Sequence, residues 1–231
     1  PRLAELTRVV LALLGTALAP GFSPLLVNQI YAPAQRLFQG LCQAAPAVFP
    51  PLLRSEREKT TDRGVEAFLL QLLLASSAPA APEEAELLKL CARFLARDTE
   101  EGRDSRAVGM SLARRGEAAL AALLEVFDEA TPGAQKHILR LADDLVRFRA
   151  ASPAGVEAFA RVVLRAAESS QRGIRITALG CRGIAKEEVP EALREQLAES
   201  FLNAIPDLGF RAEVEMAEET VALLGLPALE P

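Results

Sequence analysis

The sequence has 231 residues, half of them hydrophobic and 25% charged, with a net charge of −5, so it can bury a core of ordinary size. Only 5% of the residues are aromatic and none is tryptophan, whereas alanine, leucine, glutamate and arginine dominate, which predicts an all-α protein. The three cysteines are odd in number and far apart, which argues against a disulfide framework and favours the cytoplasm. Arginine greatly outnumbers lysine, and we interpret this as the composition of a GC-rich bacterial genome.

The N-terminal part is apolar and rich in proline. Residues 9–35 contain no charged side chain, and a helix is predicted over 2–18. The apolar run 9–19 is too short for a membrane span, which needs about 20 residues. We expect a buried helix; a surface that docks a partner, and a retained signal or membrane contact, are the alternatives. Residues 1–55 are thus predicted to form a divergent cap, in which the segment from 23 onward is kinked or broken by its prolines.

The rest of the chain predicts a series of short helices. Residues 54–62 (RSEREKTTD) predict a charged loop. Helical spacing of apolar residues then predicts helices over 64–75, 82–97, 103–114, 117–130, 132–149, 153–168, 173–186, 190–205 and 209–224. We expect one domain over 1–231, with central repeats over 56–186 and an acidic C-terminal repeat or cap over 187–231.

These helices group into pairs with a recurring period. The second helix of each pair is expected to begin near 23, 64, 102, 133, 173 and 209, which lie 31 to 41 residues apart. Residues 174–180 (IRITALG) resemble the second helix of a HEAT repeat, and 134–141 and 210–217 match that pattern more loosely. The resemblance to HEAT and armadillo-like repeats implies a right-handed α-solenoid of about six helix pairs, with 11–12 helices, whose second helices line the concave surface.

The sequence offers little catalytic or metal-binding chemistry. His137 is the single histidine, and its helical phase favours a structural or surface role. The cysteines are scattered, so no metal-ligand spacing exists, and no phosphate-binding or dinucleotide-binding glycine loop is present. Neighbouring carboxylates such as Asp143 and Asp144 point about 100° apart on a helix, which suits solvated faces better than acid–base catalysis. We therefore expect no catalytic residues, no metal and no cofactor.

Charge is distributed unevenly along the chain. Residues 1–101 carry a net −1, residues 102–186 a net +5 and residues 187–231 a net −9. In the middle part the cations recur on the expected second helices, where they would form a basic ridge. The predicted ridge residues are Arg103, Arg106, Arg114, Lys136, Arg140, Arg147, Arg172, Arg175, Arg182 and Lys186. Exposed helix faces must carry charge in any case, so a merely solvated surface is the competing interpretation.

These features predict an interaction protein rather than an enzyme. The forked guanidinium of arginine binds carboxylates well, so an acidic segment of another protein is the expected partner on the ridge. The opposite charges of the middle and C-terminal parts also allow head-to-tail self-association. Nucleic-acid binding, or DNA processing on a HEAT-like fold, is the alternative. It is disfavoured by the pI of 5.2 and by the shortage of aromatic residues for base stacking.

Overall fold

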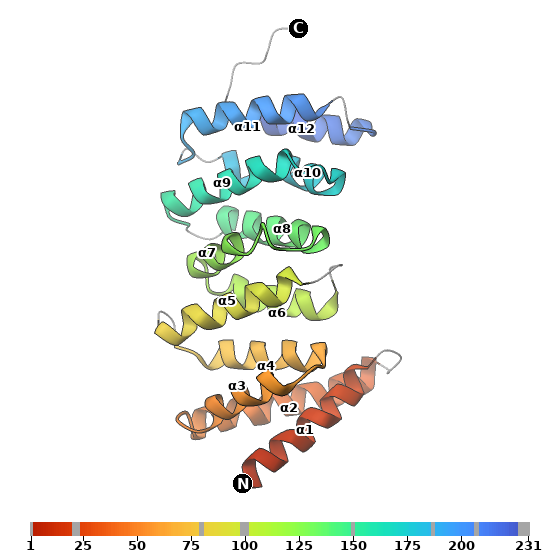
Figure 1. Cartoon of the computed structure of the whole chain (residues 1–231), viewed down its shortest axis with the longest axis vertical. Coiled ribbons are helices and arrows are strands. Elements are labelled where there is room, and N and C mark those ends of the chain that lie inside the picture. Colours follow the sequence, from red (N-terminus) through yellow and green to blue (C-terminus); the bar gives the residue numbers. More distant parts are fainter. Residues whose placement is uncertain are drawn as a thin grey trace. The chain divides into compact units, whose positions relative to one another are not determined.

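The computed structural model describes residues 2–19, 24–78, 81–97, 102–148, 151–185, 188–205 and 208–225. These residues form twelve α-helices and one short 3₁₀ helix (η1) without any strand, which confirms the all-α class (Figure 1). None of the helices in these ranges combines the length and the apolar character needed to cross a membrane. The chain forms two compact units, the first made of Pro1–Cys91 and Gly102–Leu112 and the second of Ala92–Glu101 and Ala113–Pro231.

The first unit is organised around α4, the most apolar of its helices. Its helices are α1 (Arg2–Leu18), α2 (Pro24–Ala44), α3 (Phe49–Lys59), α4 (Arg63–Ser76), α5 (Pro82–Ala96) as far as Cys91, and most of α6 (Arg103–Ala113). α4 contacts α1, α2 and α3, and its leucines are buried. The helix begins where the side chain of Asp62 accepts a hydrogen bond from the N–H of Val65 at 2.9 Å, as an N-cap residue does.

One expectation for this unit was wrong and a second was wrong in part. The charged loop predicted over 54–62 is instead mostly helix, because α3 begins at Phe49 and continues to Lys59. Its two prolines occupy the first turn, where a missing N–H costs no intrahelical hydrogen bond. α2 also continues past Pro33, so the helix is not broken there, whereas a kink at this proline stays a prediction.

α1 confirms the helix predicted over 2–18, but only one of its faces is buried. Leu11, Leu14 and Ala17 lie in the core. Leu6, Val9 and Leu13 lie on another face and are each more than half exposed. A partner-docking role for this apolar face stays a prediction.

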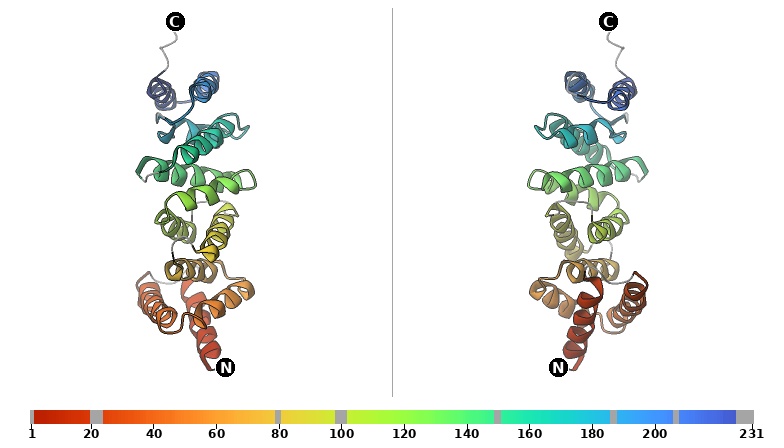
Figure 2. Two further views of the ribbon diagram at one scale, coloured as in Figure 1. Left: turned by 90° about the vertical axis from the view of Figure 1, so that its left-hand side faces the viewer. Right: turned by 90° about the vertical axis from the view of Figure 1, so that its right-hand side faces the viewer.

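The second unit consists of helices in successive pairs. They are α7 (Glu117–Glu125), α8 (Pro132–Phe148), α9 (Pro153–Ala167), α10 (Arg172–Leu179), η1 (Gly183–Ala185), α11 (Glu191–Ala204) and α12 (Arg211–Leu223). Contacts join α7 to α9 and α9 to α11, and a second row joins α8 to α10 and α10 to α12. The two rows meet in the pairs α7–α8, α9–α10 and α11–α12, the last of which is seen end on in Figure 2.

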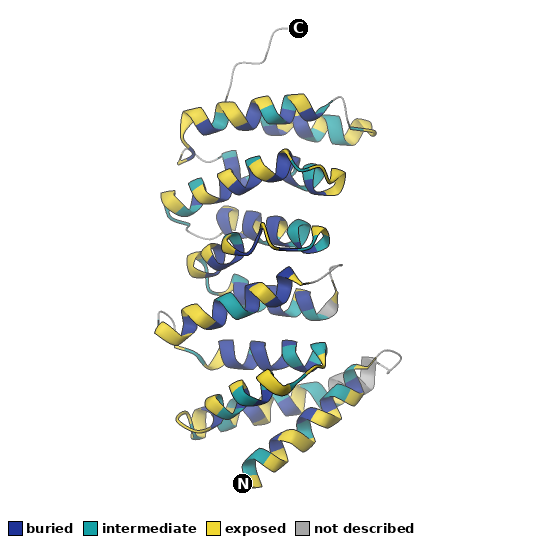
Figure 3. Cartoon of the chain, in the orientation of Figure 1, coloured by how far each residue is buried: buried dark blue, intermediate teal, exposed yellow. Residues whose placement is uncertain are grey.

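The core of this unit lies between the two rows. On α9 the buried face carries Val156, Phe159 and Val163, and on α8 it carries Ile138 and Val146 (Figure 3). Alanines such as Ala142, Ala160 and Ala178 are also fully buried, which lets the helices approach closely.

The prediction of one helix over 173–186 is wrong beyond Leu179. α10 ends at Gly180, and the chain then turns into the 3₁₀ helix η1. The backbone N–H of Gly183 donates to Oδ1 of Asp143 on α8 at 2.6 Å, which holds the turn against that helix. Arg182 therefore follows α10 rather than lying on it.

Candidate interaction surface

The structure divides the ten predicted ridge residues between the two units. Arg106 is exposed on α6 in the first unit. The side chain of Arg103 and all of Lys186 lie outside the described residues. Arg114 is exposed in the turn after α6. The second unit brings together the other six predicted residues, which are Lys136, Arg140, Arg147, Arg172, Arg175 and Arg182.

Arg172 and Arg182 form hydrogen bonds with side chains of α12. Nη2 of Arg172 donates to Oε2 of Glu213 at 2.7 Å. Nη2 of Arg182 donates to Oε2 of Glu219 at 2.7 Å, and its Nη1 donates to Oγ1 of Thr220 at 2.9 Å. Thr220 is fully buried and donates in turn to the carbonyl oxygen of Leu179 at 2.7 Å, at the end of α10. These arginines thus pair with acidic residues of the same chain.

Arg175 stabilises the turn between α9 and α10. Its Nη1 donates to the carbonyl oxygens of Ser169 at 2.8 Å and Ser170 at 3.1 Å. Carbonyl groups beyond the end of a helix need such partners, and a cation at this position also interacts favourably with the helix dipole. Arg175 therefore has a structural role at this turn, whether or not it also meets a partner.

The remaining three cations lie on α8. The side chain of Lys136 lies beside Gly173. Its atoms are at ordinary van der Waals distance from the position that a Cβ on this glycine would take. Arg140 lines a hollow of about 250 Å³, which residues of α10 and α12 such as Thr177 and Met216 also line. Nη1 of Arg147 lies 3.6 Å from Oδ2 of Asp143, one turn earlier on the same helix. The predicted ridge thus becomes, on this unit, a row of cations along α8.

Asp143 is a buried carboxylate beneath this row. Burial raises its pKa above the ordinary value, although the N–H of Gly183 and the charge of Arg147 act in the opposite direction. Cys181 lies beside it, and burial raises the pKa of that thiol well above its ordinary value. Burial also raises the pKa of Cys91 to about 12. Both thiols are therefore protonated at neutral pH and are poor nucleophiles.

The residues that the structure describes contain no group of three or more histidine, cysteine or acidic side chains placed to hold a metal ion. His137 is half-buried on α8, one residue before the buried Ile138.

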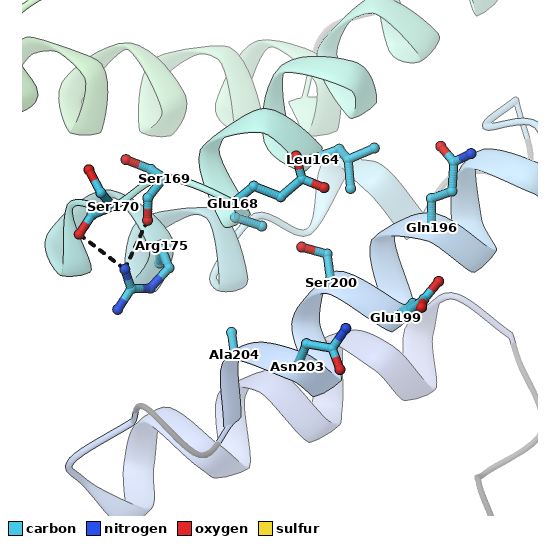
Figure 4. Close-up of a pocket in the computed structure, with 11 residues that line it drawn as sticks. Leu164, Glu168, Ser169, Ser170, Arg175, Gln196, Glu199, Ser200, Asn203 and Ala204 are labelled. Carbon is cyan, nitrogen blue, oxygen red and sulfur yellow. Dashed lines mark hydrogen bonds between the residues drawn. The ribbon is translucent and has the colours of Figure 1, made fainter.

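A second hollow, of about 560 Å³, was not predicted from the sequence. It lies beside α11 and the end of α9, and Gln196, Glu199, Ser200 and Asn203 of α11 line it (Figure 4). These four residues follow helical spacing, so the sequence did contain a signal for this polar face. A polar stripe is also the ordinary solvent face of a helix, so this pattern alone does not identify a groove.

No protein-family model, no curated protein and no solved structure matches the chain. The resemblance to HEAT repeats therefore depends on the pattern in residues 174–180 and on the helix pairs of the second unit.

Proposed function

We propose that this chain is a HEAT-like repeat protein, a right-handed α-solenoid of about six helix pairs, that acts as a non-catalytic scaffold or adaptor in the bacterial cytoplasm. Support comes from the second unit, where first helices contact first helices and second helices contact second helices. Such stacking is how a repeat buries apolar faces that a single pair cannot cover. A regulatory subunit of an enzyme is one form that this role can take.

The proposed partner is an acidic segment of another protein, bound along α8. The observation that carries this proposal is a lack of acidic residues on the neighbouring helix: α10 and the segment up to Ala185 contain no aspartate or glutamate. Glu213 and Glu219 of α12 neutralise Arg172 on α10 and Arg182 after it, but α10 has no carboxylate to do the same for Lys136 on α8. A carboxylate from a partner would supply this missing charge.

The test uses a fluorescein-labelled decapeptide of alternating aspartate and alanine, with binding followed by anisotropy at low salt. Lys136→Glu should weaken binding by about tenfold, since attraction at that point becomes repulsion. Arg161→Glu on α9 makes the same change in net charge outside this surface and should have little effect. Circular dichroism should show that both variants keep their helicity. An equal loss in the two variants, or no binding by the unaltered protein, contradicts the proposal.

Arg140→Glu is a second test of the same surface, and Arg175→Glu is a poor one. Arg140 lies beside Lys136 on the exposed side of α8, so its reversal should also weaken peptide binding. Arg175 binds two carbonyl oxygens of its own chain, so its reversal would disturb the turn before α10.

Nucleic-acid binding and self-association remain the alternative functions. Glu213 and Glu219 place carboxylates beside Arg172 and Arg182, where they would repel phosphates. Head-to-tail self-association would use the acidic C-terminal segment, in which Glu213 and Glu219 are already paired within the chain. Titration with random duplex DNA across a salt series distinguishes the first alternative, since phosphate binding weakens steeply as salt rises. Sedimentation velocity distinguishes the second.

A further inference from the structure

The hollow beside α11 has the construction of a binding groove. Its lining includes Leu164 and the buried alanines Ala167 and Ala204, whose small side chains leave room for a bound chain. Its walls are polar and come from the end of α9, the following turn, Arg175 and α11 (Figure 4). All of these residues belong to the second unit.

The polar side chains of this groove have no partners within the described part of the chain. There, none of Glu168, Gln196, Glu199, Ser200 and Asn203 makes a side-chain hydrogen bond or ion pair. Elsewhere on the second unit, glutamates such as Glu157, Glu213 and Glu219 are each paired with an arginine. The groove therefore collects donors and acceptors that the fold does not use.

The charges around the groove favour a cation. Glu168 stands at the C-cap position of α9, and Glu199 stands across the groove on α11 (Figure 4). The C-terminal end of a helix carries partial negative charge, which adds to that of the two carboxylates. Arg175 is the basic residue of the lining, and two carbonyl oxygens of the turn already hold its guanidinium.

The amides of α11 suit the backbone of an extended peptide. Gln196 and Asn203 are seven residues apart, which along a helix is about 10 Å. An extended chain rises about 3.3 Å per residue, so the two amides span about three residues of peptide. A side-chain amide both donates and accepts, as the peptide backbone does, and so can pair with it irrespective of sequence.

We propose that this groove binds an extended segment of another protein that carries a lysine or arginine side chain. The amides of Gln196 and Asn203 bind the backbone of that segment, and its cation lies between Glu168 and Glu199. The site is separate from the α8 surface and has the opposite charge preference. A chain with both sites would join an acidic segment of one partner to a basic segment of another.

The test is a fluorescence anisotropy titration with a labelled heptapeptide of serine and alanine that has one central lysine. The same peptide with norleucine at the centre reports on the charge. The lysine peptide should bind at least fivefold more tightly than the norleucine peptide. Glu199→Lys should abolish this preference, whereas Glu195→Lys, which changes an exposed residue of α11 outside the groove, should keep it.

Further variants separate a built site from nonspecific attraction to an acidic protein. Asn203→Ala should weaken both peptides equally, since the amide binds the backbone. Lys136→Glu should leave the affinities for the lysine and norleucine peptides unchanged, because Lys136 belongs to the α8 surface and not to this groove. The groove and the α8 surface can therefore be tested independently. Equal binding of the two peptides, equal loss in Glu195→Lys and Glu199→Lys, or no binding at all would overturn the proposal.

Discussion

The position of Gly183 offers the sharpest test of how the second unit is packed. A Cβ at this position would stand 2.8 Å from Cγ1 of Val146 and 3.1 Å from Oδ1 of Asp143. Both neighbours are buried, Val146 completely, so neither can move into solvent. Gly183→Ala therefore forces the turn away from α8, and overpacking of this kind costs about 1–3 kcal/mol.

Two further effects adjust this magnitude. Gly183 is not among the glycines with positive φ, so alanine fits its backbone and gains about 0.4–1 kcal/mol by restricting the unfolded chain. Displacement of the turn also lengthens the 2.6 Å hydrogen bond from Gly183 to Asp143, and because Arg182 and Arg147 still interact with that carboxylate, the loss of this one bond costs about 0.5–1.5 kcal/mol. We expect a net loss of about 2 kcal/mol from the free energy of unfolding.

Urea denaturation followed by circular dichroism measures this loss. Gly173→Ala is the matched control, because a Cβ there meets Lys136 at ordinary contact distance, and stability should hold or rise slightly. Val146→Ala and Gly183→Ala together should destabilise the protein by about 1 kcal/mol less than the sum of the two single variants, a coupling that marks direct contact. A change of less than about 0.5 kcal/mol in Gly183→Ala would refute the packing described for η1.

Three other expectations concern ionisable groups. The pKa of Asp143 is raised, so the folded protein binds this proton more tightly than the unfolded chain does. The free energy of unfolding should therefore fall as the pH rises from about 3.8 through the pKa of the folded state. Urea titrations across pH should show that Asp143→Asn lacks this fall. Burial alone would raise the pKa of Glu56, but hydrogen bonds from Lys59 and Arg8 lower it below the ordinary value. The stability that this carboxylate contributes is therefore present above about pH 4.5 and is lost at lower pH, and Glu56→Gln should lack that loss in acid. With a pKa of about 12, Cys91 should resist iodoacetamide at about pH 8 in the folded protein and react fully in urea, as mass spectrometry can show.

The helix content and most helix starts could be predicted because local signals determine them. Pro82, Pro132 and Pro153 each stand at the first position of a helix, as expected of a residue that lacks an N–H. Apolar spacing identified the buried face of α9 correctly, but on α8 it placed Phe148, which is 69% exposed, on the same face as the buried Ile138 and Leu145. These signals lie within one or two helical turns, so a single sequence is enough to find them.

The errors arose where distant residues decide the local structure. The charged run after Arg54 looks like a loop, but it folds as helix, in which Glu56 pairs with Arg8, 48 residues away. The end of α10 could not be predicted from Gly180 alone. It also depends on the hydrogen bond that the N–H of Gly183 donates to Asp143, which is 40 residues earlier in the sequence. Tertiary contacts of this kind override local propensity, and no window of the sequence contains both partners.

The charge pattern carries a further lesson about the candidate sites. The basic middle and acidic C-terminal segments suggested a cationic surface open to partners, yet α12 itself supplies carboxylates to Arg172 and Arg182. Exposed ion pairs contribute little stability each, about 0–1 kcal/mol, so these contacts orient α12 more than they stabilise it. Net charge along a sequence therefore cannot show which groups are left for a partner. In the described part of the second unit, Lys136 on α8 and the polar wall of α11 are such groups, and only the pattern of internal pairs distinguishes them from the other charged and polar residues.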